Sequence, residues 1–273
     1  MKQFEVAGHE PSFLPEGQWE LTWADEFDGS ELDRTKWDFR MSMMGKWWPA
    51  WTDKGVTLDG NSSCVFTLIE ENGKPVSSQL QTGYNFMDQP VVKTSAFGDD
   101  DLQWPIGKLR KSLFTHKYGY YECRCRLQQK PGWWSAFWIQ SPIIGASLDS
   151  RQSGTEIDVM ESFSPGEIIH HSLHTGGYGL DRNSATTGSS MRLDKTQFHR
   201  FGVYWDENGY VFYVDGVETG RSDRNPSDCP EFILISTEVM GYRAKGNQPE
   251  KAAFDAIGDT FVVDYVRVFD LKK

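Results

Sequence analysis

Three acidic residues interrupt an apolar segment near the middle of the chain, over residues 154–161. The Ile and Val residues between them favour a β-strand, in which successive side chains point to opposite faces. Glu156 and Asp158 then share one face, and strict alternation places Glu161 on the other. A β-bulge would add one residue and return Glu161 to the face of the other two acids. Because carboxyl groups are costly to bury, we interpret this face as the floor of a cleft where they act as acid, base or nucleophile.

The segments on either side of the acids carry side chains typical of a sugar-binding site. Upstream, alternation along a predicted strand places Trp134 and Trp138 on one face. Downstream, His170, Ser172 and His174 share a face of the next strand. Tryptophan stacks on the apolar face of a pyranose, and polar groups bind its hydroxyls. We expect the two histidines to bind substrate or to tune the acids, and a purely structural role stays open for His170.

Further motifs occur in a fixed order along most of the chain. They are Trp23-Ala24-Asp25-Glu26-Phe27-Asp28-Gly29 with Trp37, Tyr118-Gly119-Tyr120-Tyr121-Glu122-Cys123-Arg124, Ser135-Ala136-Phe137-Trp138, and Asp264-Tyr265-Val266-Arg267-Val268-Phe269. Together with the acidic strand, this set resembles glycoside hydrolase family 16, in the branch whose catalytic strand has the bulged acidic motif. The resemblance covers about residues 19 to 270. It implies an all-β fold, a concanavalin A-like β-jelly-roll sandwich of two antiparallel sheets with a concave substrate groove.

The resemblance also implies a role for each acid. Glu156 would be the nucleophile, Glu161 the general acid/base, and Asp158 the residue that tunes both, in a double displacement that retains the anomeric configuration. The spacing alone does not predict this, because an ideal strand would put positions 156 and 161 roughly 13–16 Å apart at ~3.3 Å per residue. A retaining pair needs carboxyls about 5–5.5 Å apart, so the strand would have to curve and bulge. The alternative without chemistry is an acidic edge strand that discourages aggregation.

Length and patterning predict one catalytic domain. At 273 residues, the chain fits a single large β-sandwich. Short strands and turn signals begin at Trp19, and no long amphipathic helix is evident. We therefore predict an N-terminal arm over residues 1–18 and one β-jelly-roll domain over 19–273, active as a monomer.

Charge and hydropathy exclude some partners. The net charge of −11 argues against a nucleic-acid or anionic-membrane partner. No run of about 18 apolar residues predicts a membrane span. The first residues lack the apolar stretch of a signal peptide. Because the resemblance implies export, we expect a secreted, periplasmic or cell-surface protein whose leader is absent from this sequence.

Tryptophans in irregular segments are candidates for the walls of the groove. Aromatic residues make up 14% of the chain and include 11 tryptophans, more than we expect a core to need. Trp48 and Trp51 lie in an irregular segment over 41–56, and Trp104 ends another. Long loops in compact domains are commonly functional. We predict that these tryptophans and Glu238 border the groove; packing beneath the loops is the alternative.

No cofactor is expected for catalysis, but the resemblance implies a structural calcium ion. Its ligands would be the Asp264 carboxylate and backbone oxygens near Glu26 and Gly60, unless Asp264 forms an ordinary ion pair. The cysteines are expected to be buried free thiols, although a disulfide that includes Cys64 or Cys229 stays open.

The polysaccharide substrate is predicted mainly from a missing motif. Laminarin-cleaving members of the family usually carry an Asn-Glu-x-Gln-Tyr-Tyr-type block where this chain has residues 47–52. The chain is in this respect more similar to members that cut agarose, porphyran or carrageenan. Guanidinium and ammonium groups suited to sulfate are supplied by Arg40, Lys46, Arg182 and Arg243. The alternative is that these four residues are ordinary surface charges. We predict an endo-acting galactan hydrolase; the alternatives are a β-1,3-glucanase with the same acids, a transglycosylase, or a non-catalytic lectin.

Overall fold

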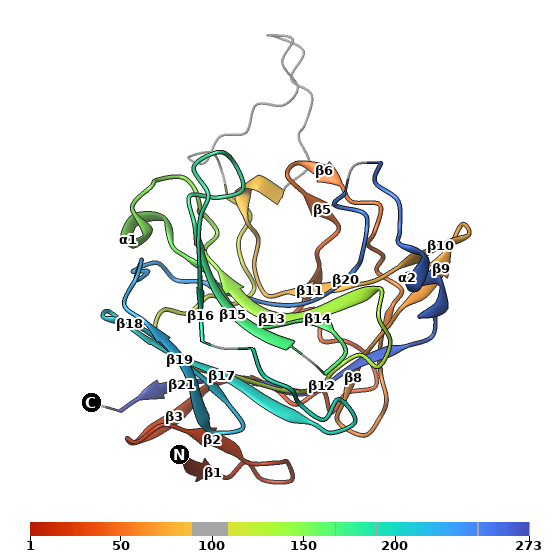
Figure 1. The fold of residues 1–273 in the computed structure, drawn as a ribbon. Helices are drawn as coiled ribbons and strands as arrows, with labels where there is room; N and C mark the ends of the chain where they lie inside the picture. Colours follow the sequence, from red (N-terminus) through yellow and green to blue (C-terminus); the bar gives the residue numbers. More distant parts are fainter. Residues whose placement is uncertain (89–108, 167, 189, 245, 273) are drawn as a thin grey trace.

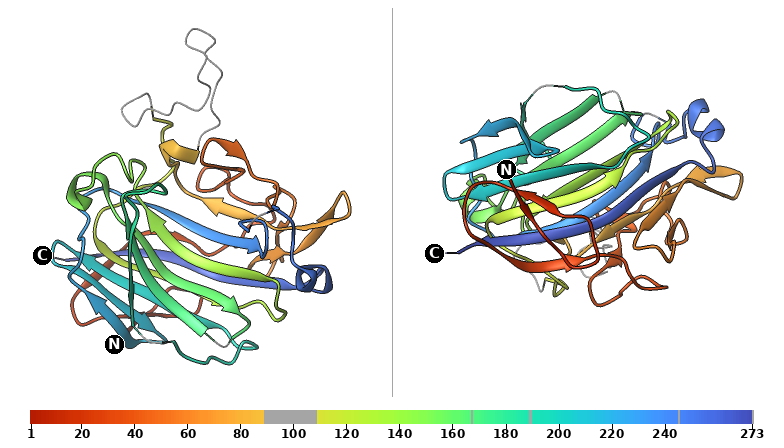
Figure 2. Two further views of the ribbon diagram at one scale, coloured as in Figure 1. Left: turned by 45° about the horizontal axis from the view of Figure 1, so that its top comes forward. Right: turned by 90° about the horizontal axis from the view of Figure 1, so that it is seen from below.

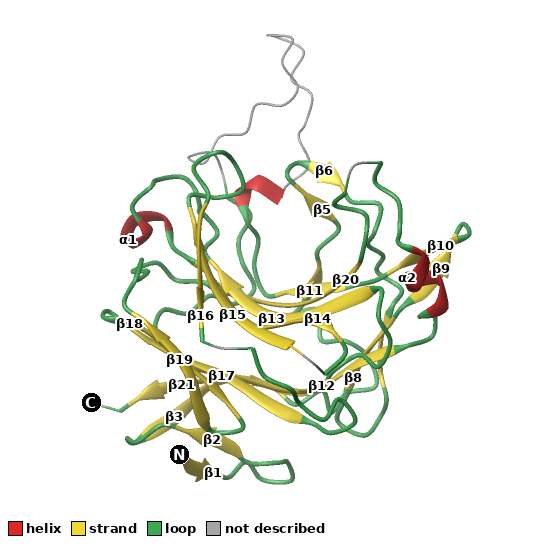
Figure 3. Cartoon of the chain, in the orientation of Figure 1, coloured by secondary structure: helices red, strands yellow, loops and turns green. Residues whose placement is uncertain are grey.

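The computed structural model describes residues 1–88, 109–166, 168–188, 190–244 and 246–272. Two antiparallel sheets pack face to face (Figure 1). Within the described residues, helix is confined to α1 (Ser150–Ser153), α2 (Lys251–Asp255) and the 3₁₀ turn η1 (Phe86–Asp88), all in connections between strands (Figure 3). No helix in these ranges is long and apolar enough to cross a membrane. The predicted all-β jelly-roll class is confirmed.

The first sheet carries the acidic strand next to its central strand. Its seven strands lie in the order β16 (Asn183–Thr187), β15 (Ile168–Thr175), β14 (Glu156–Ser164), β13 (Trp133–Gln140), β20 (Phe232–Val239), β11 (Gln79–Gln81) and β4 (Asp38–Phe39). The tryptophan-rich strand β13 is hydrogen-bonded between β14 and β20. Strands far apart in sequence are therefore neighbours in the sheet.

The second sheet forms the other layer of the sandwich. Its strands lie in the order β19 (Val217–Ser222), β18 (Gly209–Val214), β17 (His199–Asp206), β12 (Gly119–Arg126), β21 (Thr260–Leu271), β8 (Cys64–Thr67) and β7 (Val56–Leu58), with β3 (Trp19–Asp25) also paired to β21. Two small hairpins lie apart from both sheets: β5 (Ser42–Met43) with β6 (Lys46–Trp47), and β9 (Ile69–Glu71) with β10 (Lys74–Val76).

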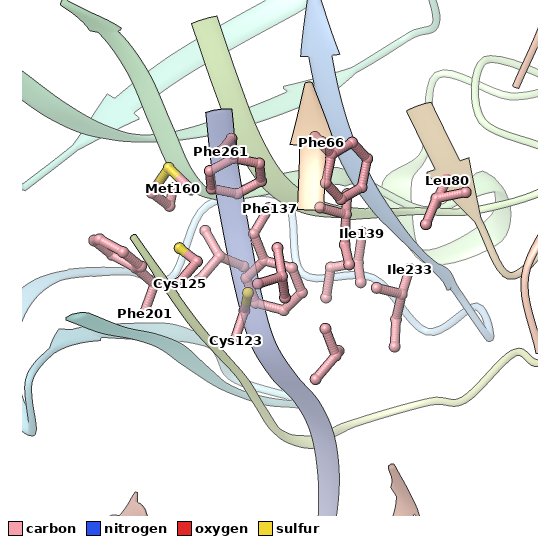
Figure 4. Close-up of a cluster of buried hydrophobic side chains, with 14 of the residues drawn as sticks. Phe66, Leu80, Cys123, Cys125, Phe137, Ile139, Met160, Phe201, Ile233 and Phe261 are labelled. Carbon is pink, nitrogen blue, oxygen red and sulfur yellow. The ribbon is translucent and has the colours of Figure 1, made fainter. Parts of the chain in front are cut away.

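Strand alternation sorts the side chains of β13 and β14 between core and exterior. Phe137 and Ile139 point into the core, as do Ile157 and Val159, and all four are fully buried. Phe201 and Phe261 from the second sheet belong to the same cluster (Figure 4). The opposite faces of β13 and β14 are thereby left for the groove.

The four cysteines are buried free thiols, as predicted. Cys123 and Cys125 lie among the apolar side chains between the sheets (Figure 4), and Cys64 belongs to the same cluster. Cys229 is also free and buried. No disulfide contributes to the fold, since all four cysteines lie in described ranges.

The first residues form a hairpin, β1 (Lys2–Phe4) with β2 (Ser12–Leu14), on the outer side of the second sheet (Figure 2, right). Buried polar groups of that sheet bind it. The carboxylate of Glu122 accepts a hydrogen bond from the N–H of Phe13 at 3.1 Å. Arg267 donates to the carbonyl of Glu10 and to the hydroxyl of Ser12, both at 2.8 Å. These contacts fix the arm to the sandwich at several points.

Candidate active site

The register of β14 shifts between Asp158 and Glu161, so the predicted bulge is present. Asp158 pairs with Trp138 of β13 and with Ser172 of β15. Glu161 pairs with the residue two places earlier in β13, Ala136. Three residues of β14 thus match two of β13, which returns Glu161 to the face of the other acids. The bulge is what brings the three carboxyls together.

All three acids line one groove on the outer face of the first sheet. The groove has a volume of about 660 Å³, within the range of about 300–1,000 Å³ that is common for ligand sites. Trp134, Trp138, Ser172, His174 and Glu238 also line it, as predicted. Four strands of the sheet, β13, β14, β15 and β20, therefore supply its floor.

Burial and mutual repulsion raise the pKa values of two of the acids. Burial, and then the neighbouring charge of Glu156, raise the pKa of Asp158 well above its usual range. Burial, followed by the charges of Asp158 and Glu156, raises the pKa of Glu161 to about 8. A carboxyl with this pKa still holds its proton at pH 7, as a general acid must.

His174 contacts Asp158 through its Nε2 atom at 3.0 Å. Burial is the largest cause of the lowered pKa of His174, so this imidazole is neutral near pH 7. The other ring nitrogen, Nδ1, is hydrogen-bonded to the hydroxyl of Ser184 at 2.7 Å. The histidine predicted to tune the acids is thus in direct contact with one of them.

Two groove tryptophans are held by neighbouring polar groups. The indole N–H of Trp138 donates to the hydroxyl of Ser236 at 2.9 Å, and the guanidinium of Arg40 lies over its ring at 5.2 Å. The Arg243 guanidinium lies over Trp134 at 5.3 Å. Arg243 also makes two hydrogen bonds to the buried carboxylate of Glu238, at 2.7 and 2.6 Å. These contacts fix the orientation of both rings in the groove.

Comparison with known proteins places the chain in a family. The family described as "Beta-porphyranase A-D, GH16 domain" matches residues 19–271. The chain belongs to glycoside hydrolase family 16. It is similar to glucan endo-1,3-beta-glucosidase A1 of Niallia circulans (26% identical, covering 91% of this chain and 37% of the relative). It is also similar to endo-1,3-1,4-beta-glycanase EglC of Rhizobium meliloti strain 1021 (28% identical, covering 92% of this chain and 51% of the relative).

The chain therefore spans only 37–51% of the length of these curated relatives. Among solved structures, the laminarinase from Rhodothermus marinus is similar, with a TM-score of 0.66 at 22% identity, covering 94% of this chain and 99% of that one. At this identity the likeness supports the fold, the jelly roll of family 16.

Several predicted groove residues lie elsewhere. Trp51 is only 3% exposed and belongs to the core cluster, so its prediction as a groove wall was wrong. Its ring packs beneath the Arg40 guanidinium at 5.0 Å. Trp48 packs against Trp51 at 6.0 Å and is absent from the groove lining. Trp104 lies outside the described residues. The backbone of His170 pairs with Glu161, but its side chain lies outside the described part.

The residues expected to bind calcium are engaged by arginines. Asp264 accepts a hydrogen bond from Arg124 at 2.6 Å. Both carboxylate oxygens of Glu26 accept hydrogen bonds from Arg267, at 2.8 and 2.7 Å. Gly60 lies in an exposed turn with φ +75°. Asp264 is the one carboxylate among the expected ligands, and the Arg124 guanidinium already neutralises it. This arrangement does not fit a cation, and calcium stays an untested prediction.

One group of potential metal ligands lies in the groove itself. Single ligand atoms of Glu156, Asp158 and His174 lie within 4.8 Å of one another, the one such group among the described residues. Burial raises the pKa of Asp158, which disfavours the ionised carboxylate that a cation would bind.

Sequence reasoning missed two polar residues beside Glu156. Gln140 donates from Nε2 to the Glu156 carboxylate at 2.5 Å and to the Tyr178 hydroxyl at 2.8 Å. Gln140 is the last residue of β13 and continues the alternation of Trp134 and Trp138, so strand parity could have identified it. Tyr178 lies in the connection after β15, where no periodicity applies.

Proposed function

We propose that this family 16 chain is an endo-acting, retaining hydrolase of a β-linked polysaccharide. The observation that carries the proposal is the convergence of Glu156, Asp158 and Glu161 in one groove, with Glu161 protonated at neutral pH. A nucleophilic carboxylate beside a protonated carboxyl is the pair that glycoside cleavage requires. Membership of glycoside hydrolase family 16 supports the same reaction.

In the first step, a carboxylate oxygen of Glu156 attacks the anomeric carbon. Glu161 donates its proton to the glycosidic oxygen as that C–O bond breaks, and the aglycone leaves as an alcohol. The sugar is then esterified to Glu156. In the second step, Glu161 removes a proton from water, the water oxygen attacks the anomeric carbon, and Glu156 is released. Two inversions give net retention.

Asp158 and His174 support both steps without bonding to the sugar carbon. The Nε2 atom of His174 lies 3.0 Å from the Asp158 carboxyl and holds it beside the two glutamates. The charge of Asp158 is in turn one cause of the raised pKa of Glu161. Asp158 therefore helps Glu161 to keep its proton until the glycosidic oxygen takes it.

The form of the groove supports cleavage within a chain. Trp134 and Trp138 lie four residues apart on β13, roughly 13 Å at ~3.3 Å per residue. Two platforms at this distance suit different rings of one polysaccharide. We therefore propose internal cleavage rather than removal of end groups.

The names of the relatives favour a β-1,3- or mixed-linkage β-1,3-1,4-glucan as substrate, and we propose this class first. The sequence-based preference for a galactan has less support. In the groove, Arg40 and Arg243 are already paired with Asp88 and Glu238, whereas Arg182 contacts the His174 ring. A galactan stays the second candidate because the matched family is described as a porphyranase domain.

We further propose that the protein acts as an exported monomer, since polysaccharides of this kind are met outside the cytoplasm. The net charge of −11 supports a soluble surface that does not bind nucleic acid or anionic membranes. Sedimentation of the purified protein would test the oligomeric state.

Reducing-end release from a panel of polysaccharides tests the proposed function. The panel holds laminarin, mixed-linkage β-glucan, agarose, porphyran and carrageenans. We expect one class to be cleaved by the natural protein and by Glu218→Gln, a control on the exposed strand β19, but not by Glu156→Gln. Binding without release by the natural protein would identify a lectin and contradict the proposal.

A further inference from the structure

Two buried amide side chains connect a backbone N–H to the proposed nucleophile. The N–H of Met87 donates to Oδ1 of Asn85 at 2.8 Å. Nδ2 of Asn85 donates to Oε1 of Gln140 at 2.8 Å. Nε2 of Gln140 donates to Oε2 of Glu156 at 2.5 Å. Asn85 is 1% exposed and Gln140 is fully buried, so water does not compete for these bonds.

The backbone end of this chain fixes the direction of every hydrogen bond in it. Oxygen and nitrogen of an amide side chain are assigned from their partners. A backbone N–H can only donate, so the Asn85 atom that faces Met87 must be oxygen. The other Asn85 atom is then the nitrogen, which requires Gln140 to present its oxygen. Gln140 is left with its NH₂ group towards Glu156.

Both hydrogens of that NH₂ group are engaged. One goes to Glu156 and the other to the hydroxyl of Tyr178, at 2.8 Å. Arg40 donates to the same hydroxyl at 3.3 Å and is itself held by Asp88, 2.6 Å away. Rotation of the Gln140 amide by 180° would place its oxygen against a carboxylate and its nitrogen against the Asn85 NH₂. The network therefore allows one orientation.

We propose that Gln140 is a positioning residue for the nucleophile and that Asn85 sets its orientation. The inference rests on the proposed function. With Oε2 of Glu156 held by Gln140, Oε1 is the oxygen that bonds to the anomeric carbon. As the bond from Oε1 to the anomeric carbon forms, the glycosidic C–O bond breaks and its oxygen takes the proton of Glu161.

The same hydrogen bond acts in the second step. Oε2 is the carbonyl oxygen of the glycosyl ester and still accepts from Gln140. When water displaces Glu156 from the anomeric carbon, negative charge returns to this carboxylate. A donor already in place stabilises that charge without reorganisation. Loss of Gln140 should thus lower kcat more than it weakens substrate binding.

The chain offers a matched control. Gln128 is also fully buried. Its Nε2 donates to the carbonyl of Ser162 at 2.7 Å, and its Oε1 accepts from the Ser135 hydroxyl at 2.6 Å. It bridges β-strands but serves no catalytic carboxylate. Gln128→Met should therefore lower the melting temperature while kcat stays within about twofold.

A double-mutant cycle tests the inference on the polysaccharide cleaved by the natural protein. Gln140→Met keeps the volume of the side chain but removes the donor, and we expect kcat to fall about 10- to 100-fold with KM within about threefold. Asn85→Asp removes the donor to Oε1 of Gln140, which frees Gln140 to turn its oxygen towards Glu156. We expect a loss of kcat of similar size. In the Gln140→Met background, Asn85→Asp should have less than about a twofold effect, because the link is already broken.

The pH profile separates positioning from a structural role. When the introduced carboxyl of Asn85→Asp is protonated, it can donate to Gln140 as the natural amide does, so the loss of kcat should shrink as pH falls. A purely structural defect would not show this recovery. If Asn85→Asp does not fold, Asn85→Ala removes the same donor without a charge and takes its place in the cycle.

The inference is overturned if Asn85→Asp and Asn85→Ala keep full kcat, or if the losses multiply in the double variant. It is also overturned if Gln128→Met loses as much kcat as Gln140→Met. Glu156→Gln distinguishes this failure from failure of the proposed function. Activity in Glu156→Gln would refute the proposed hydrolase function. If Glu156→Gln is inactive and Asn85→Asp is fully active, only the positioning role of Gln140 and Asn85 is refuted.

Discussion

Replacing Glu161 with glutamine should make the protein more stable at neutral pH while removing its activity. The pKa of Glu161 is raised from 4.5 to about 8, mainly by burial. Between these values the folded protein holds a proton that the unfolded chain releases. The unfolded state then binds fewer protons, so stability falls as pH rises through this window. Glutamine resembles the protonated acid in shape and cannot be deprotonated, so the variant escapes this loss.

The size of the effect follows from the width of the window. At pH 7 the protein is about 2.5 pH units above the usual glutamate value of 4.5, and at 1.36 kcal/mol per unit this gives an upper limit of about 3 kcal/mol. Partial exposure of Glu161 and local relaxation should reduce it to about 1–3 kcal/mol. For a chain of this length we expect a rise in Tm of about 2–6 °C at pH 7.

Thermal unfolding at pH 4 and pH 7 is the assay. At pH 4 the carboxyl is protonated in both states, so the Tm values of the natural protein and Glu161→Gln should agree. Glu218→Gln is the control, because Arg221 lowers the pKa of that exposed carboxyl and no gain at pH 7 is expected. An equal Tm difference at both pH values, or a less stable variant at pH 7, would refute the reasoning.

Three further predictions rest on other charged groups. Burial raises the pKa of Glu231 to about 8, so Glu231→Gln should raise Tm at pH 7 but not at pH 4, and it should keep its activity. Thermal unfolding and reducing-sugar assays would check both results, and a lower Tm at pH 7 would contradict the prediction. Asp158→Asn removes one cause of the raised pKa of Glu161. The alkaline limb of the plot of kcat against pH should therefore move to lower pH by about one unit. An unchanged limb would show that the charge of Asp158 does not affect the pKa of Glu161. Since arginines neutralise Asp264 and Glu26, EDTA should leave Tm unchanged, and a fall in Tm would reveal a metal site.

Much of the site follows from the alternation of two neighbouring strands. Alternation with a period of two places Trp134 and Trp138 on one face of β13, and Glu156 and Asp158 on one face of β14. The β-bulge that brings Glu161 to the same face is present in β14. These predictions succeed because one face of each strand must be apolar to form the core, which fixes the other face. Strand alternation also places Gln140 on the groove face, but a glutamine does not by itself indicate a catalytic role.

Predictions for residues in loops and ion pairs depended on contacts that no local pattern encodes. Trp51 lies in an irregular segment, and its burial depends on a bridge to Ser77 and on the Arg40 guanidinium above its ring. Asp264 pairs with Arg124 because β12 and β21 lie side by side in a particular register. Such partners come from distant parts of the chain, so composition and spacing cannot show them.

The most direct test of the account is to trap the glycosyl-enzyme and locate it. The protein would be incubated with a 2-deoxy-2-fluoro glycoside of the cleaved polysaccharide's repeating unit with a good leaving group, digested, and analysed by mass spectrometry. We predict one added glycosyl group, on the Glu156 side chain, and none in Glu156→Gln. A label on Glu161 or Asp158, or turnover of the polysaccharide by Glu156→Gln, would contradict it.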